Sequence, residues 1–232
     1  MKAILFDLDG TLLPMDEDKF VKGYFGYLYK FMMPFNFDKD EFIKAVWFGT
    51  DAMRKNDGTK TCEEAYWNAF SSVFPNKDKD ALHKGFHDFY ATEFSKAIQF
   101  CDAPYENAQG IINALKAKGY KLIVVANPVF PMVAMRKRIE FAGINPDSFD
   151  YISSYETSHF AKPNKMFIKE ILDKLNLKEE EVIYFGNSEK EDGRASRELN
   201  IKFYLTGNIV RDEKNTEPFN EVLFKDIEKL FN

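Results

Sequence analysis

The sequence predicts an α/β fold in which a doubly wound parallel sheet is interrupted by an inserted α-helical domain. The chain starts with a short apolar run, Ala3 to Phe6, that suits a buried strand. Residues 14–100 then show helical patterns almost exclusively, and after residue 102 short apolar runs alternate with helical segments. Such alternation is typical of a parallel sheet with helices on both faces. We therefore predict a core domain of residues 1–13 and 101–232 and a helical domain of residues 14–100.

Composition excludes several functional classes. The chain has 232 residues, 45% of them hydrophobic, which suffices for a large core. A net charge of −5 argues against a nucleic-acid partner, because phosphate backbones require a basic face. The sequence has no long apolar run and no secretory signal at its start, so we expect no membrane association. Only two cysteines are present, which argues against a disulfide framework and favours a cytoplasmic location. We expect a monomer or a dimer.

Two carboxylates follow the first strand. Asp7 and Asp9 lie two positions apart, so an extended segment would point both toward one site, and Gly10 permits a tight exit turn. Such acids repel unless a cation or a shared proton separates them, and oxygen ligands at this density suit a hard ion such as Mg²⁺. The alternative is a solvated turn, because Asp and Gly are common turn residues.

Four helical patterns follow in residues 14–100. Apolar residues recur at helical spacing from Phe20, from Phe42, after Thr61 and from Leu82. Thr61 and Glu64 also have the spacing of a capping box. Because each stripe must be buried against another, we predict a compact helical bundle.

The second half of the chain supplies the remaining strands of the sheet. The expected strands are 120–126, 149–153, 182–185 and 201–205, and the expected helices are 106–118, 132–142, 164–175 and 191–200. Gly119 and Gly143 directly follow the first two of these helices, as glycines at helix ends commonly do. Ligands of such sheets bind outside the carboxyl ends of the central strands, so we expect the functional residues there.

The segment Asp7-Leu-Asp-Gly-Thr-Leu12 after an N-terminal strand resembles the first motif of the haloacid dehalogenase (HAD) superfamily, most of whose members are phosphatases. The resemblance implies that Asp7 is the nucleophile that forms an aspartyl-phosphate and that Asp9 is the general acid and base. It also implies that the Asp9 backbone carbonyl faces the metal and that Gly10 and Thr11 help to bind the substrate phosphate. The helical segment has the position of the first-type cap of HAD phosphatases.

The second and third motifs of the family are matched at later strand ends. The second motif places Ser or Thr at the end of a strand, whereas here Ala126 has that position. Asn127 follows it, and its N–H and side-chain amide would face the phosphate. The third motif is a Lys before a helix, and Lys162 fits it. Its charge would offset those of Asp7 and the phosphoryl oxygens.

The fourth motif reads Gly-Asp-Ser, three variable residues and Asp, and it corresponds to Gly186-Asn-Ser-Glu-Lys-Glu-Asp192. Asn187 thus replaces the first acid and offers a metal only a neutral oxygen, while Asp192 is retained. The resemblance implies an Mg²⁺ site formed by Asp7, Asp9, Asn187 and Asp192.

These residues predict an HAD-like, Mg²⁺-dependent phosphatase acting on a small phosphorylated metabolite. Ala126 and Asn187 depart from the family pattern, so two alternatives stay open: a weakly active or non-catalytic HAD-like binding protein, and a phosphomutase. Removing one preorganised donor typically costs about 10²- to 10³-fold in rate. We therefore expect Ala126→Thr combined with Asn187→Asp to raise activity and Mg²⁺ affinity.

A histidine and a pair of arginines lie outside the four motifs and are interpreted separately. His159 precedes Lys162 in an expected loop at the active-site face and is a candidate substrate contact. Arg136 and Arg138 are interpreted as a solvated helix face rather than an anion site.

Overall fold

A central parallel sheet organises the computed structural model, which describes residues 1–215 and 217–231. Within these residues the sheet has six strands, and every neighbouring pair is parallel. Across the sheet the strands are β3 (Tyr151–Ile152), β2 (Lys121–Val124), β1 (Ala3–Phe6), β4 (Val182–Ser188), β5 (Lys202–Val210) and β6 (Asn220–Glu221). The first strand of the chain therefore lies between β2 and β4, and the predicted doubly wound parallel sheet is confirmed.

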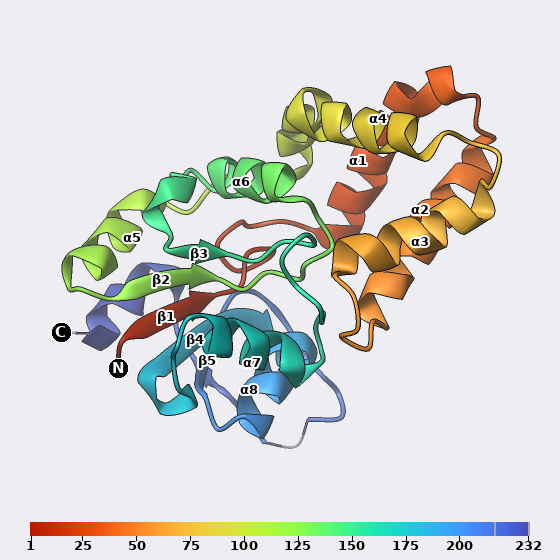
Figure 1. Ribbon diagram of the computed structural model, residues 1–232. Helices are drawn as coiled ribbons and strands as arrows, with labels where there is room; N and C mark the ends of the chain where they lie inside the picture. The colour runs from red at the N-terminus through yellow and green to blue at the C-terminus, as the bar shows by residue number, and fades with distance from the viewer. Residues whose placement is uncertain (216, 232) are drawn as a thin grey trace.

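Helices cover both faces of this sheet (Figure 1). The flanking helices are α5 (Ala108–Ala117), α6 (Met132–Phe141), α7 (Lys165–Lys174) and α8 (Arg194–Glu198). Ile4 and Phe6 of β1 pack in the apolar layer that includes α5 and α6. Ala3 and Leu5 pack in the layer that includes α7 and α8. All four side chains are fully buried, as expected of a central parallel strand.

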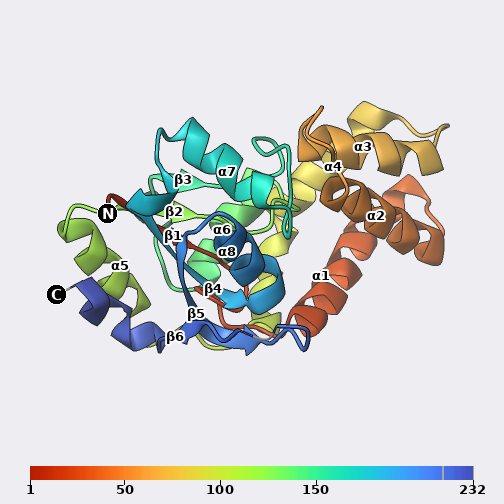
Figure 2. The ribbon, with the colours of Figure 1, turned by 90° about the horizontal axis from the view of Figure 1, so that it is seen from below.

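Residues 14–100 form a separate group of helices at one end of the sheet (Figures 1 and 2). They are α1 (Glu17–Met32), α2 (Lys39–Arg54), α3 (Cys62–Val73) and α4 (Lys79–Ala91), with short helical turns at Met33–Phe35 and Glu93–Phe100. The predicted capping box is present: Thr61 accepts the Glu64 N–H at 3.1 Å, and Glu64 accepts the Thr61 N–H at 2.8 Å. In the described residues, no helix has the length and apolar character needed to cross a membrane.

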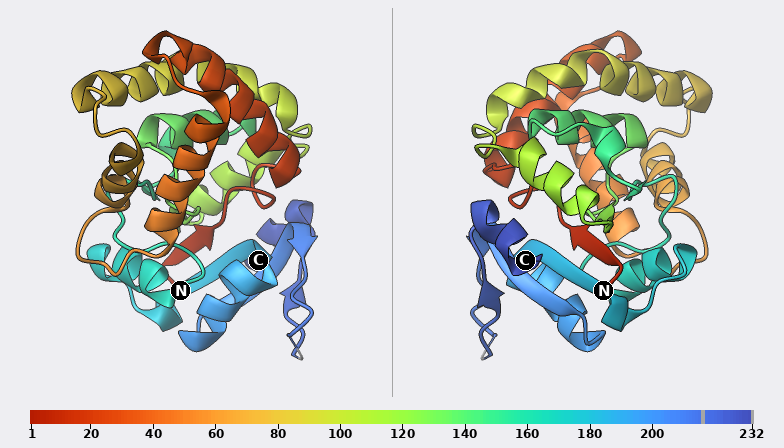
Figure 3. Two further views of the ribbon diagram at one scale, coloured as in Figure 1. Left: turned by 90° about the vertical axis from the view of Figure 1, so that its right-hand side faces the viewer. Right: turned by 90° about the vertical axis from the view of Figure 1, so that its left-hand side faces the viewer.

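The inserted helices face the viewer in the left view of Figure 3, and their apolar interior continues into the layer below them. Phe94 connects the two parts. Its ring centroid lies 5.9 Å from that of Phe130 and 6.0 Å from that of Phe141, both of which follow β2 in the chain. One apolar cluster therefore extends from the inserted helices to the α5 and α6 face of the sheet. The division into two domains stays a prediction.

Several element boundaries differ from those expected. The strand predicted at 149–153 is only two residues long, whereas β5 continues beyond residue 205 because Val210 pairs with Ser188 after a register shift. The helix predicted at 191–200 is α8 preceded by a π-helical turn, Glu189–Gly193. Strand β6 was not predicted, because two polar residues give no apolar pattern.

Candidate active site

The carboxyl end of β1 places two acids where three strands end together. The Val125 N–H donates to the Phe6 carbonyl and the Asp7 N–H donates to the Phe185 carbonyl, so β1 is held on both sides up to its last residue. Gly10 then turns the chain with a φ of +73°. A Cβ at Gly10 would lie 2.2 Å from Nδ2 of Asn187, so the close approach of these two motifs requires glycine.

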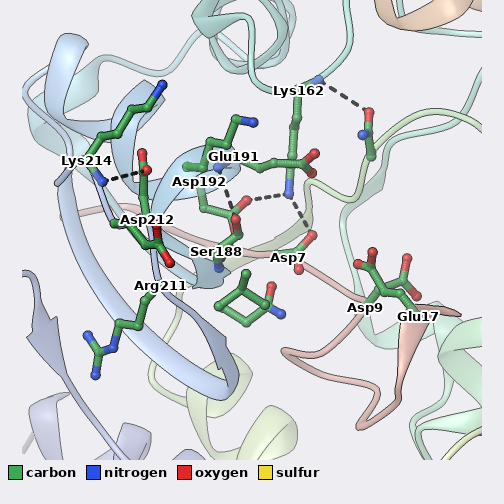
Figure 4. A pocket seen from close by; sticks show the side chains of 15 residues that line it. Asp7, Asp9, Glu17, Lys162, Ser188, Glu191, Asp192, Arg211, Asp212 and Lys214 are labelled. Atoms are coloured by element: carbon green, nitrogen blue, oxygen red, sulfur yellow. Dashed lines mark hydrogen bonds and ion pairs between the residues drawn. The ribbon is translucent and has the colours of Figure 1, made fainter. Parts of the chain in front are cut away.

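Asp7 belongs to a buried ionic cluster. Lys162 Nζ lies 2.6 Å from Asp7 Oδ1 and 2.6 Å from Asp192 Oδ1 (Figure 4). The Thr11 hydroxyl donates to Asp7 Oδ2 at 2.9 Å, and the Tyr184 hydroxyl donates to Asp192 Oδ1 at 2.5 Å. These hydrogen bonds orient both carboxylates, and they connect the first, third and fourth motifs in space.

Burial and charge act in opposite directions within this cluster. Burial raises the pKa of Asp7 from its ordinary value of 3.8 to about 6, although the adjacent Lys162 charge partly offsets this rise. Burial disfavours the charge on Lys162, but the carboxylates of Asp192 and Asp7 outweigh it and raise the pKa of Lys162 well above its ordinary value. Lys162 is therefore a permanent cation beside the proposed nucleophile.

Asp9 pairs with a different cation, Arg138 of α6, through its Oδ2 and the Arg138 Nη2. The Arg138 side chain is 1% exposed, so its interpretation as part of a solvated helix face is wrong. The same interpretation is right for Arg136, which is exposed and pairs with Asp147 at 2.6 Å. Burial lowers the pKa of Arg138 to about 9, and the charge of Asp7 partly offsets this.

The sequence contained a signal for the buried arginine. On a helix, residues three or four positions apart share a face. Arg138 is spaced in this way from Ala134, Met135, Phe141 and Ala142, all of which are buried. Its position in this apolar stripe therefore predicts a buried side chain, and its proximity to the exposed Arg136 does not.

Two adjoining cavities open beside the acids. The first has a volume of about 480 Å³ and is lined mainly by polar and charged side chains, including six of the predicted site residues: Asp7, Asp9, Asn127, Lys162, Asn187 and Asp192. The second, of about 640 Å³, extends between α1, α2 and the loop after β2 and has many apolar side chains in its walls. Asp9, Glu17, Asn127 and Glu191 line both cavities, so the two meet at these residues.

Three of the residues predicted to bind the substrate phosphate lie away from the two cavities. Among the described residues, Gly10, Thr11 and Ala126 do not line either cavity. Gly10 forms the turn, Thr11 holds Asp7, and Ala126 is fully buried in the apolar layer. Asn127, by contrast, reaches the cavities, and its Oδ1 accepts the Lys162 N–H at 3.3 Å. Direct phosphate contacts of the first three residues stay predictions.

Asn187 and His159 also have partners within the protein. Asn187 Nδ2 donates to the Asn208 carbonyl at 2.9 Å, which ties the fourth motif to β5. His159 Nδ1 lies 2.6 Å from Glu170 of α7, and the Glu170 carboxylate also accepts the His159 N–H at 3.0 Å. These contacts give His159 a structural partner away from the cavity lining.

The donors around the first cavity fit Mg²⁺ in type and charge. Carboxylates outnumber cationic side chains in its lining. Within those residues, no group of three His, Cys, Asp or Glu side chains could hold a metal. A Mg²⁺ ion at this site would therefore need oxygens of water or of the substrate phosphate in addition to the side chains.

Comparison with known proteins gives consistent family and fold relationships. A family model described as haloacid dehalogenase-like hydrolase matches residues 4–206. A HAD phosphatase from Thermococcus onnurineus has 17% sequence identity and a TM-score of 0.60, covering 100% of this chain and 98% of that chain. A 2-haloacid dehalogenase from Pseudomonas syringae pv. Tomato DC3000 has 12% identity and a TM-score of 0.65, with coverage of 100% and 98%.

A third solved structure, a putative HAD-hydrolase from Bacillus subtilis described as bound to magnesium, has 17% identity and a TM-score of 0.55. The alignment covers 99% of this chain and 96% of that chain. The search of curated protein sequences gave no match. At these identities the solved structures are evidence of a common fold, and they include both phosphatases and dehalogenases.

Proposed function

Because the chain belongs to the haloacid dehalogenase-like hydrolase family, we propose that it is a Mg²⁺-dependent phosphatase that hydrolyses a small phosphorylated metabolite through an aspartyl-phosphate. The observation that supports this best is the different placement of the two acids at the end of β1. Asp7 is paired with Lys162, whereas Asp9 lies where the polar and the apolar cavities meet. This difference supports a role for Asp7 in the attack on phosphorus and a role for Asp9 in protonating the leaving group.

The leaving group distinguishes a phosphatase from a dehalogenase. A halide departs without a proton, whereas the alkoxide released from a phosphate monoester needs an acid to protonate it. Asp9 is a carboxyl group at the junction where such an oxygen would lie. A second acid two residues after the nucleophile therefore favours phosphate ester hydrolysis over dehalogenation.

The proposed reaction has two steps. An Asp7 carboxylate oxygen forms a bond to phosphorus while the ester P–O bond breaks, and Asp9 gives its proton to the departing oxygen. Asp9 then takes a proton from water as that water attacks the phosphorus of the aspartyl-phosphate, which restores Asp7 and releases phosphate. Lys162 offsets the charges of Asp7 and the phosphoryl oxygens throughout.

Mg²⁺ would be held by Asp7, the Asp9 carbonyl, Asn187 and Asp192, and when bound it would neutralise charge on the phosphoryl oxygens. The metabolite would place its phosphate in the first cavity and the rest of its structure in the second. Apolar side chains of α1 and α2 in that second cavity support a role of the inserted helices in substrate choice.

A panel of phosphorylated metabolites with Mg²⁺, scored for phosphate release, tests the proposal. The same protein is assayed for halide release from 2-haloacids, and Asp7→Asn serves as the control in both assays. Phosphate release that disappears in Asp7→Asn supports the phosphatase. Halide release without phosphate release assigns the dehalogenase activity instead. Conversion of a sugar phosphate to its isomer assigns a phosphomutase, and binding without turnover assigns a non-catalytic protein.

A further inference from the structure

A buried arginine beside the proposed general acid has no part in the reaction described above. The Arg138 guanidinium lies over the Phe130 ring at 4.3 Å from its centroid, and Nη1 lies 3.2 Å from the Met135 sulfur. Neither neighbour supplies a negative charge. Because burial of an unpaired cation is unfavourable, Arg138 depends on its ion pair with Asp9.

The two acids of the first motif are held by separate cations. Lys162 is bound to Asp7 and Asp192, and Arg138 is bound to Asp9. If one cation held both acids of the motif, it would draw both carboxylates toward the attacking side of the phosphate. The separate cation instead holds Asp9 toward α6, beside the apolar cavity in which the leaving group would lie.

The two carboxylate oxygens of Asp9 have different surroundings. Oδ2 is paired with Arg138, whereas Oδ1 is buried and has no hydrogen-bond partner in the described residues. The proton of a carboxylic acid can reside on either oxygen, and with the proton on Oδ1 the other oxygen, Oδ2, still accepts a hydrogen bond from the guanidinium. Oδ1 is therefore the oxygen that can carry a proton while Asp9 stays bound to Arg138.

We propose that Arg138 is a positioning residue that holds the Asp9 carboxyl group, through Oδ2, at the junction of the two cavities, where the leaving oxygen of the substrate would lie. This inference rests on the proposed phosphatase function. Asp9 takes up a proton from solvent on Oδ1 before this step, while Oδ2 keeps its hydrogen bond from the guanidinium. As the P–O bond breaks, its electron pair stays with the leaving oxygen, which takes that proton from Asp9. The fixed guanidinium then stabilises the carboxylate that remains.

The test uses two substrates that differ in their need for an acid. An alkyl phosphate accepted by the protein requires protonation of its leaving group, whereas 4-nitrophenyl phosphate releases a stable phenolate. Their kcat/KM values are compared because these report only the steps up to formation of the aspartyl-phosphate. In Arg138→Met we expect kcat/KM to fall at least about tenfold for the alkyl ester and less than about threefold for the aryl ester.

Matched variants separate positioning from general damage to the fold. Arg136→Met removes an exposed arginine from the same helix and should leave both kcat/KM values unchanged. Arg138→Lys retains a positive charge and should give a smaller loss on the alkyl ester, and it provides the test if Arg138→Met does not fold. In an Asp9→Asn background, Arg138→Met should have no further effect on the ratio of the two values, because the acid is already absent.

Equal losses on the two esters in Arg138→Met, or in Arg138→Lys if only that variant folds, would overturn the positioning role. So would a further change in the ratio in the Asp9→Asn background, or a loss in Arg136→Met that matches the loss in Arg138→Met. In each of these cases the wild type still hydrolyses phosphate esters, so the proposed function stands. If the wild type releases no phosphate from any ester, both the function and the positioning role are overturned.

Discussion

Asn187 makes a hydrogen bond that an aspartate at the same position cannot make. Its Nδ2 donates to the Asn208 carbonyl at 2.9 Å, and the adjoining turn at Gly10 leaves no room for a Cβ beside it. Ala126, the other departure from the family pattern, is fully buried in a packed apolar layer. Adding a hydroxyl and a methyl group there risks overpacking, which typically costs about 1–3 kcal/mol. The expected gain in activity from Ala126→Thr with Asn187→Asp is therefore opposed by a loss of stability.

Asn187→Asp alone separates the structural and the metal-binding roles of this side chain. Without metal, we expect the variant to be less stable than wild type by about 1–3 kcal/mol, because a carboxylate would face the Asn208 carbonyl. With Mg²⁺, we expect a larger rise in Tm for the variant than for wild type, because its ligand is now charged. Thermal unfolding in EDTA and in Mg²⁺ measures both effects. Equal Mg²⁺ stabilisation of the two proteins would exclude residue 187 as a ligand.

The raised pKa of Asp7 predicts a specific pH dependence of stability in the absence of metal. Burial raises this pKa from 3.8 to about 6, so between these values the folded state binds a proton that the unfolded state has lost. The contribution of Asp7 is therefore complete below about pH 4 and is lost as the pH rises through about 6. The loss is on the order of 3 kcal/mol.

An asparagine at position 7 does not titrate, so Asp7→Asn tests whether Asp7 causes this pH dependence of stability. We expect the unfolding free energy of wild type, relative to the variant, to fall between pH 4 and pH 7 when both are measured in EDTA. Denaturant unfolding at each pH gives the two curves. Parallel curves across this range would mean that Asp7 does not titrate as described.

At the scale of the elements, local sequence patterns predicted more than contacts between distant segments. The strand before Asp7 and the capping box at Thr61 follow from neighbouring residues, and both are present. The partner of Asn187 could not be predicted, because Asn208 belongs to a neighbouring strand whose register shifts. The pairing of Arg138 with Asp9 joins a helix to a strand end, and sequence spacing contains no information about that distance.

Two neighbouring aromatic residues of α2 differ in their position relative to the second cavity. Trp47 lines the cavity, whereas Phe48 does not, although both side chains are about half exposed. If the leaving group binds there, Trp47→Ala should raise KM about tenfold through lost apolar contact, with a smaller change in kcat. Steady-state kinetics on an accepted metabolite measure this. Phe48→Ala is the matched control, and equal effects of the two variants would argue against a leaving-group site in this cavity.

At the scale of the whole molecule, the inserted helices and the sheet share one apolar interior. Phe94 of the insertion contacts Phe130 and Phe141, and Tyr24 of α1 also packs on Phe130, with 5.4 Å between centroids. A segment that was joined to the sheet only by its two connections would unfold independently. Contacts of this kind instead favour a single cooperative transition.

The two tryptophans of the chain provide a direct measurement of this cooperativity, because Trp47 and Trp67 both belong to the inserted helices. Tryptophan fluorescence therefore follows the insertion, while far-ultraviolet circular dichroism follows all helices. We expect the two denaturant transitions to coincide in wild type. Phe94→Ala should lower the unfolding free energy by about 3–5 kcal/mol. Ile98→Ala, an exposed position in the same turn, should have little effect, and separated wild-type transitions would contradict the shared core.

The contacts of Phe94 also restrict how this protein can diverge. Phe130 touches both the inserted helices and the Arg138 guanidinium beside Asp9. A lineage that replaced the inserted segment with one of another shape would lose the aromatic partners of Phe130 and disturb the support of that guanidinium. If the leaving group binds in the second cavity, we expect point substitutions on the cavity-facing side of α1 and α2 to change substrate preference with less disturbance of Asp9 than exchange of the whole segment. Descendants of this protein should differ in substrate long before they differ in architecture.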